Sequence, residues 1–257
     1  MLLVILIFAF IAVGGGLTWY LLAKDQGKKE PIGALWLVAG FGVLAAVVSA
    51  TAEHFLIPQR YLSPLGGQPL TDVLIGVLAV GAIEECAKFI PAALFLWHKP
   101  YFRNHVDGVI YFAIVGLAFG IPENILYSIQ YGAKAGAARL LLDPLFHASV
   151  TAMVGYALGK AKVDQRSLGK TVLTLLAAIL IHALYDFGLF SRQPILLATS
   201  ASLSVALAFG LFVFFIRAKE LDREDGLAVV GHNNFCRSCG QPNPKHYLFC
   251  THCGAHA

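Results

Sequence analysis

The chain has 257 residues, of which 58% are hydrophobic and 13% are charged, and its mean hydropathy is +0.70. Soluble domains average about 45–50% apolar and about 25% charged residues, so the composition excludes an ordinary soluble globular protein. The net charge of +4 is better explained by basic residues that flank membrane spans than by nucleic-acid binding, which needs a clustered basic face. The sequence predicts an all-α integral membrane protein whose partner is the lipid bilayer.

Seven hydrophobic stretches are long enough to cross about 30 Å of hydrocarbon as helices, which takes about 20 residues each. The predicted spans are 2–22, 32–56, 71–97, 107–130, 138–159, 170–190 and 194–216. They predict a bundle of about seven transmembrane helices that forms a membrane domain over residues 1–216.

Basic residues orient this predicted bundle. The first stretch has its lysines after the apolar run (Lys24, Lys28, Lys29) rather than before it, so we interpret it as a retained helix and not as a signal peptide. Twelve Lys and Arg residues fall on the side that includes this first loop and four on the other side. The positive-inside rule then places the N-terminus outside and the C-terminus in the cytoplasm.

The tail has a different composition from the bundle. Residues 217–234 are predicted to form a linker, and residues 235–257 carry two CxxC pairs, Cys236 with Cys239 and Cys250 with Cys253. Two such pairs offer four thiolates to one tetrahedral Zn²⁺, which favours a small structural zinc ribbon. Two disulfides are the alternative, but cytosolic thiols stay reduced. The ribbon is a candidate docking module for a cytosolic protein.

Several ionisable residues lie well inside the predicted spans, where each costs a few kcal/mol and is by default a functional candidate. They are Glu84, Glu85, Lys88, Glu123, His147, His182 and Asp186. At about 1.5 Å per residue, the two glutamates of the third span, Glu123, His147 and His182 fall within one or two helical turns of the bilayer middle, on four successive helices. Other polar residues nearer the span ends are interpreted as interface or capping groups. These are Glu53, His54, Asp107 and Asp143.

Carboxylates and imidazoles gathered in a low-dielectric site have the chemistry of a hydrolase, because a buried carboxylate can act as a general base. His and Asp or Glu side chains also suit a catalytic metal with an open position for water. An alternative for Glu84 is a structural ion pair with Lys88, four residues on, which would leave the chemistry to Glu85. The alternative for His182 is a hydrogen bond to its own neighbour, Asp186.

The order of these motifs resembles the PrsW family of intramembrane proteases, which is grouped with the CAAX prenyl proteases and bacteriocin-processing proteins. The resemblance covers residues 71–190. The motifs are Glu84-Glu85-Cys-Ala-Lys88, Asp107-Gly-Val-Ile-Tyr111, Phe119-Gly-Ile-Pro-Glu123-Asn124, His147-Ala-Ser-Val-Thr151 and His182-Ala-Leu-Tyr-Asp186. The wider superfamily has His where this chain has Glu123, and its last motif often ends in Asn where this chain has Asp186.

The resemblance implies a prokaryotic intramembrane endopeptidase that cleaves membrane-anchored proteins, with Glu84 and Glu85 in the catalytic role. It also implies that the later motifs, including Asn124, bind a metal or position water. The candidate ligands of that metal are His147, His182, Glu123 and Asp186. A glutamate-only mechanism stays open beside a metal-dependent one. An ion-coupled transporter and a non-catalytic membrane scaffold with the ribbon as its docking module are the alternative functions.

Overall fold

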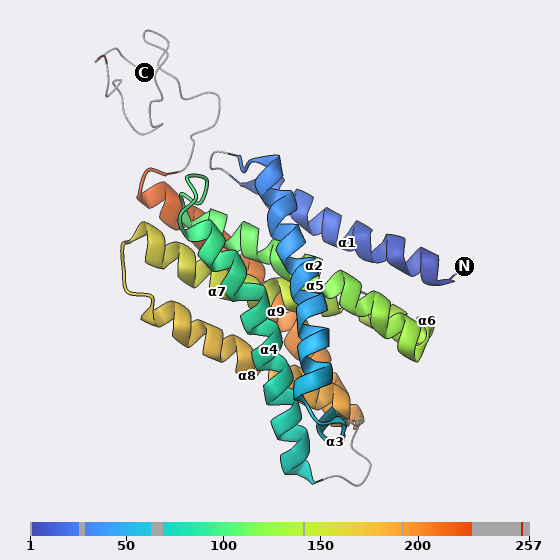
Figure 1. Cartoon of the computed structure of the whole chain (residues 1–257). Helices are drawn as coiled ribbons and strands as arrows, with labels where there is room; N and C mark the ends of the chain where they lie inside the picture. The colour runs from blue at the N-terminus through green and yellow to red at the C-terminus, as the bar shows by residue number, and fades with distance from the viewer. Residues whose placement is uncertain are drawn as a thin grey trace.

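The computed structural model describes residues 2–25, 29–62, 69–140, 142–191, 193–227 and 253, and the helices account for nearly all of them. This part of the chain contains seven long helices and two short ones, without strands (Figure 1). The long helices are α1 (Leu2–Lys24), α2 (Ile32–Leu56), α4 (Leu70–Trp97), α5 (His105–Tyr131), α7 (Leu142–Val163), α8 (Gly169–Ser191) and α9 (Pro194–Glu224). The short ones are α3 (Gln59–Leu62) and α6 (Ala133–Arg139). The prediction of an all-helical bundle with seven long helices is confirmed.

Five of the long helices in the described part of the chain are long and apolar enough to cross a membrane: α1, α2, α5, α8 and α9. The remaining two, α4 and α7, are less apolar because they carry polar residues, among them Glu84, Glu85, Lys88 and His147. That α4 and α7 also cross the bilayer stays a prediction, as does the orientation of the termini. The outer faces are strongly apolar, as the exposed side chains of Trp36, Phe55 and Phe209 illustrate. An apolar exterior around a polar interior is the arrangement of an integral membrane protein.

Two predicted boundaries differ from the structure. The fifth helix begins at Leu142 rather than at residue 138, because residues 133–139 form the separate short helix α6. The last helix continues through the charged run to Glu224, so residues 217–224 of the predicted linker are helical.

Helix α5 is the centre of the bundle and packs against α7, α2, α1 and α9. Every residue of α5 from His105 to Leu117 is buried. Its start is fixed by a capping box, in which the Asn104 side chain accepts from the Asp107 amide and the Asp107 carboxylate accepts from the Asn104 amide. Asp107, expected from the sequence to cap this helix, therefore acts at its third position and shares the capping with Asn104.

Glycines let α5 and α7 approach until their backbones touch. A Cβ atom on Gly108 would lie 2.4 Å from the carbonyl oxygen of Gly155, and one on Gly116 would lie 2.3 Å from that of His147. On the other side of the bundle, a Cβ on Gly81 of α4 would lie 2.9 Å from the carbonyl oxygen of Ile179 in α8. The close packing of α5 with α7 and of α4 with α8, the helices that carry the polar residues, thus depends on glycines at positions where a larger side chain would not fit.

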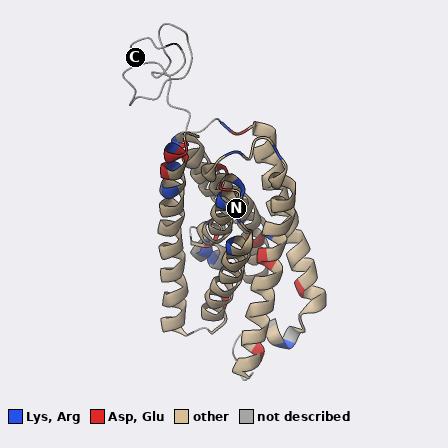
Figure 2. Ribbon diagram, turned by 90° about the vertical axis from the view of Figure 1, so that its left-hand side faces the viewer, with Lys and Arg blue, Asp and Glu red and all other residues tan. Residues whose placement is uncertain are grey.

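The end of α9 is joined to the start of α5 by a buried carboxylate. Asp222 accepts hydrogen bonds from the His105 amide (2.8 Å), the His105 Nδ1–H (2.7 Å) and the Val106 amide (3.0 Å). The Nε2 atom of His105 lies 3.1 Å from Asp164, in the turn that follows α7. Lys, Arg, Asp and Glu gather near the end of the bundle where α9 ends, as Figure 2 shows.

Candidate functional site

The ionisable residues predicted to share one depth do meet in the interior, and they come from four helices. Helix α4 supplies Glu84, Glu85 and Lys88, α5 supplies Glu123, α7 supplies His147, and α8 supplies His182 and Asp186. All of these residues except Glu123 are buried, while the Glu123 side chain keeps 28% of its surface exposed. The site is therefore enclosed but has one carboxylate at its margin.

Lys88 contacts both glutamates of α4 and has no exposed surface (0%). Its ammonium group donates to Glu85 Oε1 (2.7 Å), to Glu84 Oε2 (3.2 Å) and to His147 Nδ1 (3.0 Å). It also lies over the Phe119 ring, 4.0 Å from the ring centroid. One lysine thus neutralises both glutamates in part and ties α4 to α7. The ion pair that the sequence offered as an alternative role for Glu84 is present, but Glu85 shares it.

Glu85 and His182 form a second connection, between α4 and α8. Glu85 Oε1 lies 2.7 Å from His182 Nδ1, and because a carboxylate only accepts, the imidazole proton is on Nδ1. The Nε2 atom of His182 is left facing Glu84 Oε2 at 3.6 Å and Asp186 Oδ2 at 3.5 Å. A carboxylate that fixes the tautomer of a histidine in this way is common behind metal-binding imidazoles.

Glu84, His147 and His182 offer ligand atoms that all lie within 4.8 Å of one another. One carboxylate and two imidazoles form a donor set that suits a catalytic Zn²⁺ or a similar divalent ion with an open position for water. The two imidazole rings are 5.4 Å apart between centroids. The residues present therefore fit a metal by the chemistry of their donor atoms, at the point where the Lys88 ammonium now donates to Glu84 and to His147 Nδ1.

His147 faces a second acidic group on its other side. Its Nε2 atom lies 2.7 Å from Glu123 Oε2 and 3.5 Å from Asp143 Oδ2. Glu123, Asp143 and His147 form a second group whose ligand atoms lie within 4.8 Å of one another. Both carboxylates of this group already pair with the Arg139 guanidinium, so this side has a counter-charge of its own.

Three contributors to this second side are missing from the sequence-based candidates: Asp143, Arg139 and Tyr185. Asp143 was expected to be an interface or capping residue, yet it is fully buried in the site and accepts from Arg139, from Asn124 and from the Tyr185 hydroxyl (3.0 Å). Asn124, predicted to belong to the site, also donates to the Gly120 carbonyl oxygen (2.7 Å). The spacing of Arg139, Asp143 and His147 at four-residue steps was the signal available in the sequence.

Carboxylates outnumber permanent cations in and beside the site. Helix α2 adds Glu53, which interacts electrostatically with Glu84, Glu123 and Asp186. In the described part of the chain, the carboxyl groups gathered here are Glu53, Glu84, Glu85, Glu123, Asp143 and Asp186, and the cations are Lys88 and Arg139. A buried excess of negative charge has to be balanced by protons on these groups or by a bound cation.

Most of the predicted zinc ribbon lies outside the residues that the structure describes. Cys236, Cys239 and Cys250 lie outside the described residues, and Cys253 is described only as exposed. Cys86, next to Glu85 in the sequence, is half-buried. His54 is exposed near the end of α2 and takes no part in the polar cluster of the described residues.

Known proteins resemble the chain over most of its length. Residues 30–217 match the PrsW family intramembrane metalloprotease. Protease PrsW of Bacillus subtilis is 30% identical over 212 residues, which cover 82% of this chain and 91% of that protein. Protease PrsW of Halalkalibacterium halodurans is 28% identical over 225 residues, covering 85% and 99% respectively, and that of Geobacillus kaustophilus is 28% identical over 189 residues, covering 73% and 81%. No solved structure matches the chain. With the family match spanning the whole polar site, the chain belongs to the PrsW family of intramembrane proteases.

Proposed function

We propose that this PrsW-family protease hydrolyses peptide bonds of membrane-associated protein substrates at the group formed by Glu84, His147 and His182. The observation that carries the proposal is the meeting of this carboxylate and two imidazoles, from three helices, within 4.8 Å in the interior of the bundle. The transporter and scaffold alternatives are not favoured, since the matched relatives are proteases.

Glu84 is the better candidate for the base of the pair. Its side chain keeps 8% of its surface exposed against 1% for Glu85, and it faces the free Nε2 of His182. In the proposed step, Glu84 takes a proton from water as the water oxygen bonds to the scissile carbonyl carbon. The carbon–nitrogen bond then breaks, and the same proton passes to the leaving amide nitrogen.

Glu85 and Lys88 position the reacting groups. Glu85 holds His182 by its Nδ1–H and so presents Nε2 to the site. Lys88 holds the Glu84 carboxylate and the Nδ1 atom of His147 at fixed positions. Groups that are held in place in this way need no rearrangement during the reaction.

The same Glu84, His147 and His182 are the residues that would hold a divalent metal. Such an ion supplies polarisation of the scissile carbonyl and of the attacking water. Glu123 and Asp186 are the flanking carboxylates, and Asn124 fixes Asp143 behind His147. Glu84 would be a ligand when a metal is bound and the base when none is, so its substitution tests the site in both cases.

The test is cleavage of a single-span membrane protein that is co-reconstituted with the full chain in liposomes. We expect Glu84→Gln to lower the cleavage rate by about 10²–10⁴-fold, the usual contribution of a general base. Glu85→Gln should lower it by about 10–100-fold, as expected for a group that orients another. Glu220→Gln, which changes an exposed carboxylate paired with Arg217, is the matched control and should cleave at the normal rate. Normal cleavage by Glu84→Gln would overturn the proposal.

We further propose that the protease domain, with its core at 71–190, extends to the end of α9 at Glu224, and that residues 225–234 link it to a ribbon at 235–257. The four ribbon cysteines, Cys236, Cys239, Cys250 and Cys253, would bind one structural Zn²⁺. The family match ends at residue 217, which supports an appended module, and we propose that this module docks a cytosolic protein. Zinc content should fall by one ion per chain when residues 228–257 are deleted, and an unchanged content would exclude the ribbon.

A further inference from the structure

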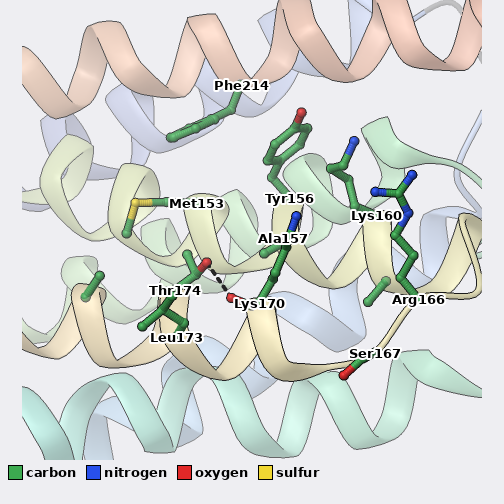
Figure 3. Close-up of a pocket in the computed structure, with 12 residues that line it drawn as sticks. Met153, Tyr156, Ala157, Lys160, Arg166, Ser167, Lys170, Leu173, Thr174 and Phe214 are labelled. Carbon is green, nitrogen blue, oxygen red and sulfur yellow. Dashed lines mark hydrogen bonds between the residues drawn. The ribbon is translucent and has the colours of Figure 1, made fainter.

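A groove of about 400 Å³ opens between α7, α8 and α9, away from the polar site. Its inner part is apolar and is lined by Met153, Ala157, Leu173 and Phe214 (Figure 3). Met153 precedes the end of α7 by ten residues, which corresponds to about 15 Å along the helix. The groove therefore runs about 15 Å along the helices from the end of the bundle.

Basic side chains gather at one end of this groove. Lys160 from the end of α7, Arg166 from the following turn and Lys170 from the first turn of α8 all line it, together with the Tyr156 side chain (Figure 3). The first turn of α8 lies at the same end and adds the partial positive charge of a helix N-terminus. The groove thus has two parts: a polar entrance with three basic side chains and a tyrosine, and an inner part lined by apolar side chains.

One carboxylate partly neutralises this basic end. Asp164 lies 3.3 Å from Arg166 Nε and 3.8 Å from Lys160 Nζ. Lys170 forms no ion pair within the described residues, and its side chain is exposed. After Asp164 is counted, the groove entrance keeps a net positive charge that no described carboxylate balances.

A second groove at the same end gives a contrast. It measures about 260 Å³ and lies between α4, α7 and α8, where Trp97, His98 and Leu175 are among its lining residues. None of its lining residues is Lys or Arg. Lys and Arg are common at this end of the bundle, but of these two grooves only the one between α7, α8 and α9 is lined by them.

We propose that the groove between α7, α8 and α9 binds one anionic glycerophospholipid, with its phosphate at Lys160, Arg166 and Lys170 and an acyl chain along Met153, Leu173 and Phe214. Basic pockets between transmembrane helices bind acidic lipid headgroups in this way. The apolar depth of the groove selects a lipid over a free phosphate, because a free phosphate has nothing to bury there. The site does not depend on the chemistry proposed for Glu84.

Native mass spectrometry of the purified full chain with added phosphatidylglycerol or phosphatidylcholine tests this assignment. We expect one tightly held phosphatidylglycerol and weaker phosphatidylcholine binding. Arg166→Gln with Lys170→Gln should weaken phosphatidylglycerol binding by about 10–30-fold, from the usual effect of two basic residues at a lipid headgroup. The matched control is Lys24→Gln with Lys219→Gln, which removes two charges that lie near each other and outside the groove lining. It should bind as the unchanged protein does.

Two further variants separate a seated lipid from other occupants. Ala157→Phe fills the apolar part and leaves the cations in place, so it should also weaken phosphatidylglycerol binding. A photo-crosslinking residue at Leu173 should label lipid in liposomes. Equal binding of the two lipids, equal losses in the groove and control pairs, or full binding by Ala157→Phe would overturn the proposal. So would a cross-link from position 173 to a co-reconstituted peptide or to a second copy of the chain.

Discussion

Removing the Asp222 carboxylate should destabilise the whole bundle, even though this residue lies in a run that the composition assigns to a linker. The carboxylate accepts from two amides and one imidazole at the start of α5 and is 3% exposed. In Asp222→Asn, the amide group keeps one acceptor oxygen and turns its NH₂ toward a donor. At least one buried donor is then left unpaired.

The size of the effect follows from these contacts. An unpaired buried donor costs about 1–3 kcal/mol, and loss of the negative charge at a helix N-terminus costs about 0.3–1 kcal/mol. At about 2–4 °C per kcal/mol for a chain of this size, we expect the Tm of Asp222→Asn to fall by about 3–16 °C. Deleting residues 217–257 removes the same carboxylate together with the buried Ala218 and should cost at least as much. Deleting 228–257 leaves all these contacts in place.

Thermal unfolding of the purified protein in detergent, followed by emission of the three tryptophans, measures the difference. The matched control is Asp225→Asn, whose side chain is 47% exposed and lies 3.9 Å from His105; it should shift the Tm by less than about 1 °C. The reasoning is wrong if Asp222→Asn melts within about 1 °C of the unchanged protein, or if the two deletions are equally stable.

Three other predictions concern different parts of the molecule. Burial, reinforced by the charge of Asp25, raises the pKa of Glu30 in the α1–α2 connection from 4.5 to about 8. Stability should therefore fall as the pH rises from about 4.5 to about 8, where the unfolded chain has lost this proton and the folded chain has not. Glu30→Gln should then raise the Tm by a few degrees at about pH 9 and hardly at about pH 5; an equal gain at both would contradict this origin. Gly116→Ala places a Cβ 2.3 Å from a backbone oxygen of α7 and should cost about 1–3 kcal/mol of unfolding free energy and most of the cleavage activity, whereas Gly40→Ala, with nothing within 4 Å, should be neutral in both assays. Asp143→Asn should lower the cleavage rate by about 10–100-fold through the loss of support behind His147, and a normal rate in a folded variant would remove Asp143 from the site.

Much of the architecture could be predicted from hydropathy. The seven long apolar stretches do become the seven long helices, because a span of fixed thickness imposes a length that the sequence displays directly. The meeting of Glu84, Glu123, His147 and His182 could be predicted from depth, since four costly groups at one level have little reason to be there except together.

The remaining features of the site and the fold could not be predicted from the depth of residues in the membrane. Asp143 falls near the end of a predicted span, and the site role of Arg139 has no signal in depth, because the break between α6 and α7 leaves no mark in the hydropathy. Asp222 was hidden in a charged run that resembles a solvated linker. The helix neighbours of α5 follow from glycine contacts that only three-dimensional packing reveals.

The contacts of Lys88 and Tyr185 have a consequence for how variants of this protein are interpreted. Lys88 joins α4 to His147 of α7, and the Tyr185 hydroxyl joins α8 to Asp143 of α7. The same bonds that arrange the reacting groups therefore also fasten neighbouring helices to one another. A substitution at Lys88 or Tyr185 therefore removes a contact between helices and a contact within the site at the same time. Loss of cleavage in such a variant identifies a chemical role only when its folding is measured on the same sample.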